Sequence, residues 1–154
     1  MENSEIVRAT LSRMLERSEA HTDFDAAVTG IAPEARGIRP AGLPHSAWEL
    51  LEHIRRAQRD ILDFCLEAPY TSRAWPDEYW PETAEPPSPE AWDESVATVQ
   101  RDRAEFQRLV EDASIELTAI VPHGTKQTYL REVLLAADHN AYHVGQLMVV
   151  RRLV

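Results

Sequence analysis

Residues 46–65 read SAWELLEHIRRAQRDILDFC and predict a capped, amphipathic helix. Ser46 and Glu49 form a capping box, in which the hydroxyl accepts from the backbone of Glu49 and the carboxylate reaches back to the backbone of Ser46. Pro69 stops the helix soon after this stretch, because proline cannot continue a helical hydrogen-bond ladder. The inward face is marked by side chains at helical spacing: Trp48, Leu51, Ile54, Arg55, Gln58, Ile61, Leu62 and Cys65.

Three further long helices are predicted around this one. The first has an apolar stripe along one face and extends from a cap at Ser4 to about Ala20. The third begins at Ser88 and Pro89, a cap followed by a first-turn proline. The last begins at a cap on Thr128 and continues to the end of the chain. In no stretch do apolar and polar residues alternate as they would in a strand. We therefore expect an all-α fold, a four-helix bundle.

The connections between these helices are long and rich in proline. Thr22 can cap a short helical turn over residues 23–28, and residues 30–45 form a loop because prolines and glycines recur in it. Residues 68–87 contain two Trp-Pro steps and no periodicity, which predicts an unusually long connection for a helical bundle. The whole length, residues 1–154, suits one domain.

Three aromatic residues stand in the connection 68–87: Trp75, Tyr79 and Trp80. They either pack the connection onto the bundle or form a lid over a pocket. We expect at least one of them to serve only for packing. Long ordered loops often carry function, so we expect substrate specificity to reside in this segment.

The charge of the chain excludes nucleic acid as a partner. With 26 acidic and 16 basic residues, the formal net charge is −10, and such a field repels phosphates. No stretch approaches the roughly 18 consecutive apolar residues that span a bilayer, so we expect no membrane association. The first residues, MENSEIVRATLSRM, lack the basic and apolar regions of an export signal, which predicts a cytoplasmic protein.

The single cysteine, Cys65, has two interpretations. It could be a catalytic thiol, although its neighbours Ile61, Leu62, Phe64 and Leu66 favour a small buried apolar role. We prefer the buried role.

His139 and His143 stand four residues apart, which places both imidazoles on one face of the last helix, about 6 Å apart along its axis. Two imidazoles so placed can bind one ion at roughly 2.0–2.1 Å each. His53 is the best candidate for a third ligand, because it lies close to the inward stripe of its helix. His21, His45 and His123 lie near helix ends or in loops, although His45 could join the mouth of a site.

Three neutral histidines would leave positions on the ion for water or substrate, as in catalytic rather than structural zinc sites. A plainer alternative is that the histidines are polar core groups without a metal. Glu49 and Asp138 are candidates to hold the imidazoles in position, whereas Asp60 is better read as surface charge. Tyr142 and Gln146 could orient a substrate.

Two stretches, SAWELLEHIRRAQRDILDF and TYLREVLLAADHNAYHVGQLMVVRRLV, together resemble the DinB/YfiT-like superfamily of metal-binding bundles. The specific matches are Ser46, Trp48, Leu50, Leu51 and His53 in the first motif, and His139, Asn140, Tyr142, His143, Gly145 and Gln146 in the second. The resemblance implies an up-down-down-up four-helix bundle, a divalent ion such as nickel or zinc on the three histidines, and a homodimer. Relatives include S-transferases that use bacillithiol or mycothiol and a mycothiol-dependent maleylpyruvate isomerase.

Three functions remain open at this point. The first is a thiol S-transferase, in which the ion activates a low-molecular-weight thiol against a small electrophilic substrate. The second is a hydrolase that activates water at the same ion. The third is a non-catalytic metal-binding protein of the stress response. We favour the transferase.

Overall fold

The computed structural model describes residues 3–16 and 20–154, and within them the regular secondary structure is helical apart from one isolated β-bridge between Ile120 and Thr128. The all-α prediction is confirmed. The elements in chain order are α1 (Asn3–Glu16), α2 (Phe24–Val28), the 3₁₀ turn η1 (Pro33–Ala35), α3 (Ala47–Cys65), the 3₁₀ turn η2 (Asp77–Tyr79), α4 (Pro89–Glu111) and α5 (Tyr129–Leu153).

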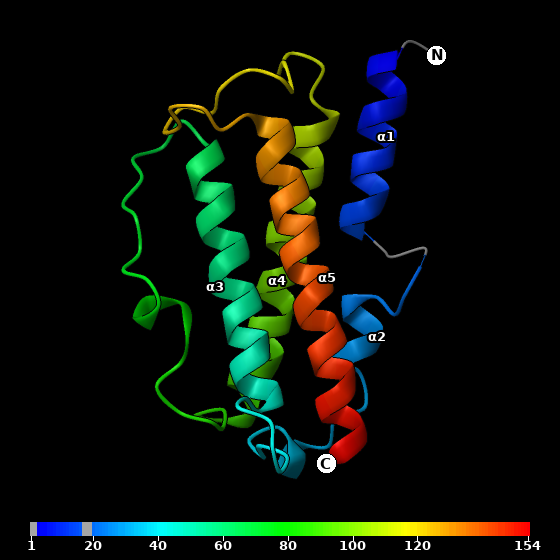
Figure 1. The fold of residues 1–154 in the computed structure, drawn as a ribbon, viewed down its shortest axis with the longest axis vertical. Coiled ribbons are helices and arrows are strands. Elements are labelled where there is room, and N and C mark those ends of the chain that lie inside the picture. Colours follow the sequence, from blue (N-terminus) through cyan, green and yellow to red (C-terminus); the bar gives the residue numbers. More distant parts are fainter. Residues whose placement is uncertain (1–2, 17–19) are drawn as a thin grey trace.

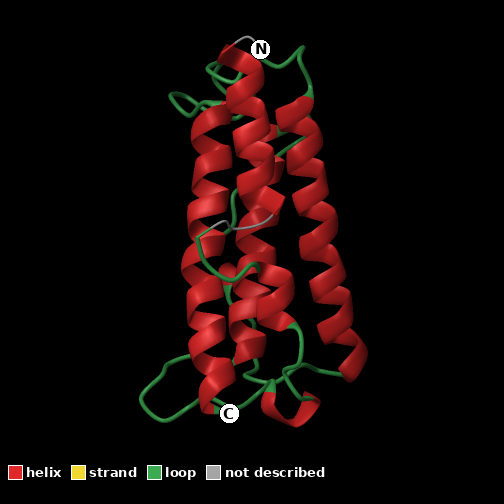
Figure 2. Ribbon diagram, turned by 90° about the vertical axis from the view of Figure 1, so that its right-hand side faces the viewer, coloured by secondary structure: helices red, strands yellow, loops and turns green. Residues whose placement is uncertain are grey.

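The long helices α1, α3, α4 and α5 lie side by side in an elongated bundle, and α2 continues the line of α1 (Figure 1). In this view α1 and α5 run downwards, whereas α3 and α4 run upwards. Two helices that follow each other and point the same way need a connection along the length of the bundle. Residues 66–88 provide it, descending beside α3, while the other connections gather at the two ends (Figures 1 and 2).

The caps predicted for the three longest helices are confirmed. At α3 both halves of the capping box form: Glu49 N donates to Ser46 Oγ at 3.2 Å, and Ser46 N donates to Glu49 Oε2 at 2.8 Å. Ser88 accepts from the backbone at the start of α4, and Thr128 does the same at the start of α5. Each pairing satisfies a helix-end N–H group that would otherwise lack a partner.

The N-terminal boundaries differ from the prediction. Ser4 lies inside α1, which already includes Asn3, and the helix has ended before Ala20; residues 17–19 lie outside the described part of the chain. The cap of α2 is Asp23 rather than Thr22, because the Asp23 carboxylate accepts from Ala26 N at 2.8 Å. The predicted loop 30–45 also contains the turn η1, in which Pro33 supplies the fixed φ of a first helical position.

Two apolar clusters fill the bundle, one at each end. Leu50, Leu51 and Ile54 of α3 belong to the lower cluster, which also includes residues of α2, α4 and α5. Phe106 and Cys65 belong to the upper cluster. Cys65 is 2% exposed, and burial raises the pKa of its thiol to about 12. The buried interpretation of Cys65 is therefore correct, since the reactive thiolate is scarce at neutral pH.

None of the helices in the described residues is long and apolar enough to cross a membrane. The cytoplasmic location stays a prediction.

Candidate metal centre

Three imidazoles from two helices meet in the lower half of the bundle. His53 comes from α3, and His139 and His143 come from the neighbouring α5. Each offers a ring nitrogen, and the three nitrogens lie within 4.8 Å of one another. Nε2 of His53 and Nε2 of His139 are 3.1 Å apart. Two nitrogens bound tetrahedrally to one ion lie roughly 3.3 Å apart, so this pair is already spaced as metal ligands are.

The Nδ1 atoms of two of these rings bind acceptors. Nδ1 of His53 lies 3.0 Å from the carbonyl oxygen of Tyr79, and Nδ1 of His143 lies 2.6 Å from Gln146 Oε1. Because both oxygens can only accept, the hydrogen sits on Nδ1 in each ring, and the Nε2 lone pair is left for the centre of the cluster. Metal-ligating histidines commonly bind a carbonyl or carboxylate oxygen through the other nitrogen in this way.

Burial keeps the three rings uncharged. Desolvation, against the opposing effect of the Tyr79 carbonyl and with smaller contributions from the neighbouring His139 and His45, lowers the pKa of His53 to about 4. Desolvation, followed by His139 and His53, also lowers the pKa of His143 to about 4. The pKa of His139 is lowered by desolvation as well. Neutral imidazoles are the form that binds a metal.

The residues present therefore fit a metal ion. Three uncharged imidazoles converge, and Nε2 of His53 lies 3.1 Å from Nε2 of His139. At that separation the two nitrogens can share either a hydrogen or a cation. Three imidazoles can hold one divalent ion, and they leave part of its coordination sphere to other ligands.

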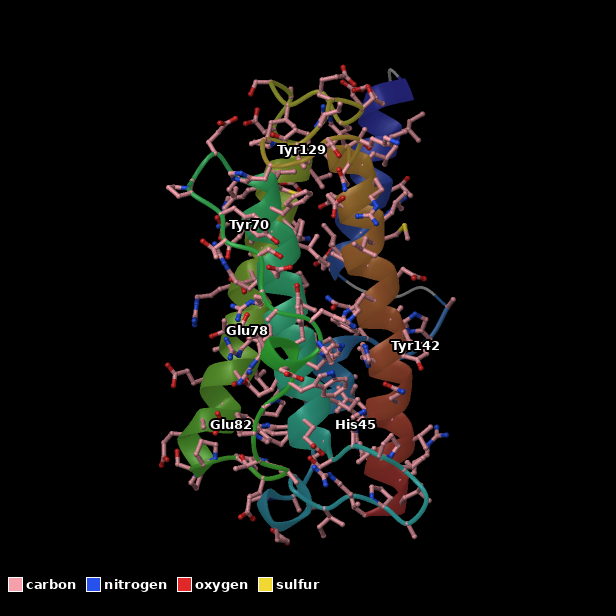
Figure 3. All side chains as sticks on the ribbon, turned by 60° about the vertical axis from the view of Figure 1, so that its left-hand side comes forward. His45, Tyr70, Glu78, Glu82, Tyr129 and Tyr142 are labelled. Atoms are coloured by element: carbon pink, nitrogen blue, oxygen red, sulfur yellow. The ribbon has the colours of Figure 1, made fainter. Side chains whose placement is uncertain are left out.

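Trp80 forms an aromatic wall beside the histidines. Its indole stacks on His53 with 3.9 Å between centroids and 3° between planes, and on His45 with 4.0 Å and 14°. The prediction that His45 joins the mouth of the site agrees with this contact. Tyr142, which is 64% exposed, packs its ring edge against His143. In Figure 3, both labelled residues lie in the lower half of the molecule, His45 just before α3 and Tyr142 on α5.

The connection that carries Trp80 is tied to α3 by side chains of that helix. The hydroxyl of Tyr79 donates to Asp60 Oδ2 at 2.6 Å, and the hydroxyl of Tyr70 donates to Asp60 Oδ1 at 3.2 Å. Arg56 donates to the carbonyl of Trp80 at 2.9 Å. Asp60 is thus an anchor for the connection, and its interpretation as plain surface charge was wrong. Trp75, by contrast, is 73% exposed, and its ring contacts that of Tyr79.

The residues predicted to hold the imidazoles or to orient a substrate divide into two groups. Gln146 holds His143, and its amide also donates to the hydroxyl of Tyr142 at 3.3 Å. Glu49 is a wrong prediction, because its two oxygens bind Arg39 and the backbone of Ser46 instead.

Asp138 is exposed and acts on His139 only through its charge, which raises the pKa of that ring. The carbonyl of Tyr79 was not predicted, since a backbone acceptor has no signature in the sequence.

A cavity of about 590 Å³ lies between α5 and the α1–α2 side of the bundle. Its walls include Gln58, Val99 and Asn140, and none of the three clustered histidines lines it.

Comparison with known proteins places this arrangement in a family. The sequence model of the DinB superfamily matches residues 16–147, which include all three histidines and the connection with Trp80. The chain belongs to the DinB superfamily. Like other sequence-level matches, membership in the DinB superfamily does not by itself assign a reaction.

One solved structure supports the fold. A conserved protein from Enterococcus faecalis, known from its crystal structure, superposes on this DinB-superfamily chain with a TM-score of 0.63 and 19% sequence identity. The match covers 100% of this chain and 98% of the other. At this identity the likeness concerns the fold alone. A comparison with curated proteins found no match.

Proposed function

We propose that this protein binds one divalent metal ion through His53, His139 and His143 and is a metal-dependent thiol S-transferase. The observation that carries the proposal is the convergence of three uncharged imidazoles, two of which bind acceptors through Nδ1 and so keep Nε2 free. Nickel and zinc are the ions expected from membership in the DinB superfamily, and both accept imidazole nitrogen, as iron and copper also do. When bound, such an ion supplies Lewis acidity, which favours the anionic form of a thiol at neutral pH.

The side chains around the cluster provide surfaces for a small substrate. The stacked rings of His45 and Trp80 form one aromatic wall, and the exposed ring of Tyr142 stands beside His143. Flat aromatic surfaces suit a planar electrophile, which would stack on them. Gln146 holds the Tyr142 hydroxyl and His143 at once, so it can fix the distance between substrate and cluster.

A non-catalytic metal-binding protein is the second candidate. It is favoured by the position of the 590 Å³ cavity, which none of the three histidines lines. Binding pockets of enzymes usually include the reacting groups, so a cavity elsewhere weakens the case for catalysis.

Elemental analysis of protein purified without an affinity tag tests the metal site. We expect close to one divalent ion per chain, and loss of the ion in His53→Ala and His139→Ala. His123→Ala is the matched control, because His123 is only partly buried and binds the carbonyl of Ala68 instead of joining the cluster. Absence of metal in the unsubstituted protein would contradict both candidate functions.

A thiol-consumption assay then separates them. The metal-loaded protein is mixed with bacillithiol or mycothiol and a chloro-dinitrobenzene, with His143→Ala and His123→Ala in parallel. Turnover that is lost only in His143→Ala supports the transferase. Metal binding without turnover with either thiol supports the non-catalytic protein, and ester hydrolysis without thiol would point to the hydrolase.

We also propose that the working form is a homodimer that pairs α5 with α5 of a second copy. An exposed, largely apolar stripe follows this helix: Leu134, Asp138, Tyr142, Gly145, Val149 and Leu153. Asp138 and the exposed Arg152 each stand seven residues from Gly145, where a Cβ atom would meet nothing within 4 Å. A two-fold axis at Gly145 would bring each Asp138 opposite the partner's Arg152 in an antiparallel pair.

A further inference from the structure

Two amide side chains, joined by a hydrogen bond, cross the interior behind the histidine cluster. Gln58 of α3 is 2% exposed, and its Nε2 donates to the carbonyl of Val99 in α4 at 2.8 Å. Its Oε1 accepts from Nδ2 of Asn140 in α5 at 2.6 Å. The orientation of both amide groups is fixed, because the Val99 carbonyl can only accept a hydrogen bond. The NH₂ group of Gln58 must face Val99, and the NH₂ group of Asn140 must therefore face Gln58.

With these orientations, one amide atom has no hydrogen-bond partner. Asn140 Oδ1 is buried and has no hydrogen bond, and Nδ1 of the adjacent His139 is also buried and has none. A buried acceptor and a buried ring nitrogen that both lack partners are costly, and the nitrogen becomes the complement of the acceptor when it carries the ring hydrogen.

We propose that Asn140, oriented by Gln58, is the positioning residue of His139: rotation of the imidazole or the amide closes the missing hydrogen bond, in which Oδ1 accepts the Nδ1 hydrogen and Nε2 of His139 is kept free for the metal. The role completes a pattern, since the Tyr79 carbonyl acts in this way on His53 and Gln146 on His143. It rests on the proposed metal site, although it concerns the proton of His139 and can be tested without metal.

The competing arrangement explains why positioning matters. If the hydrogen of His139 moved to Nε2, it could bond to Nε2 of His53 across the 3.1 Å that separates the two atoms. That bond would consume both lone pairs and close the site to a cation. Asn140 opposes it, because its oxygen makes Nδ1 the better place for the hydrogen.

Two variants of the full-length protein test the proposal by zinc titration and by NMR of the histidine ring nitrogens in metal-free protein. Asn140→Ala removes the acceptor, so we expect the hydrogen of His139 to move to Nε2 and zinc affinity to fall about 10–100-fold. Asn140→Asp keeps an acceptor for His139 but places a carboxylate against Gln58 Oε1. It is expected to lower the melting temperature while zinc affinity stays at least at the original level. Arg101→Gln, at an exposed position of α4 outside the cluster, is the control and should change neither.

The outcomes separate a positioning role from a structural one. Equal loss of zinc affinity in Asn140→Ala and Asn140→Asp would show that Asn140 only supports the fold, and would overturn the proposal. A hydrogen on Nε2 of His139 in the metal-free unsubstituted protein would also overturn it. If the unsubstituted protein binds no zinc, the proposed metal function fails, but the ring-nitrogen measurement still decides whether Asn140 holds His139.

Discussion

The indole of Trp80 lies flat on the imidazole of His53, with 3.9 Å between centroids and an angle of 3° between the planes. The two residues are far apart in sequence, and the Tyr79 carbonyl next to the indole accepts from the same imidazole at 3.0 Å. One short segment of the connection therefore fixes both the plane and the tautomer of His53.

Replacing Trp80 with alanine is expected to loosen His53 and admit water to it. Trp80 is only partly buried, so the free energy of unfolding should fall by about 2 kcal/mol, less than the 3–5 kcal/mol of a fully buried tryptophan. Metal should dissociate faster, and Trp80→Phe should restore most of its retention because a ring can still stack. Chemical denaturation and competition with a chelator measure these effects. Trp75→Ala is the control, because Trp75 is exposed; an equal effect there would refute the role of Trp80.

Asp60→Ala is expected to release the connection from α3. Both tyrosine hydroxyls lose their acceptor, and the pKa of Tyr79, which burial and the bond to Asp60 raise, should fall towards its ordinary value. Each lost bond to a charged group costs about 1.5–3 kcal/mol, so cleavage by a protease within residues 68–87 should accelerate. Tyr79→Phe should reproduce more of this change than Tyr70→Phe, because its bond is shorter. Unchanged proteolysis in Asp60→Ala would mean that other contacts hold the segment.

Local signals in the sequence predicted the helices and the three histidines well. The capping box of Ser46 and Glu49 depends on residues three apart, and the pairing of His139 with His143 depends on one helical turn. Such short spacings survive folding unchanged. His53 was predicted as the third ligand because it lies close to the inward face of its helix. In the structure, this helix packs against α5.

The surroundings of the site could not be predicted in the same way. Arg39, from an irregular loop, takes both oxygens of Glu49, and no periodicity in the sequence reveals that contact. The carbonyl of Tyr79 and the indole of Trp80 reach His53 only because a long connection returns along α3. Contacts made by loops depend on the path of the whole chain, whereas contacts within a helix depend on its period.

Acid should destabilise the metal-free protein through two of its histidines. Burial lowers the pKa of His53 and His143 to about 4 in the folded state, whereas each titrates near 6.5 when unfolded. Between these values the unfolded chain binds more protons, so stability is full above about pH 7 and is lost as the pH falls from 6.5 to 4. The loss is at most about 3 kcal/mol for each histidine. Urea unfolding across this range measures it, and a double variant, His53→Gln with His143→Gln, should flatten the slope. An equally steep slope in that variant would assign the effect to other groups.

A charge exchange on α5 tests the proposed dimer. Asp138→Arg should place two arginines opposite each other across the two-fold axis, and Arg152→Asp should do the same with two aspartates, so each single variant is expected to weaken the dimer by tenfold or more. The double variant restores opposite charges and should restore dimerisation, which a general disturbance of the surface would not do. Sedimentation equilibrium measures the dissociation constant in all three. Arg101→Asp, on α4 away from the stripe, is the control. A monomeric unsubstituted protein, or single variants that dimerise as well as it does, would exclude this face as the interface.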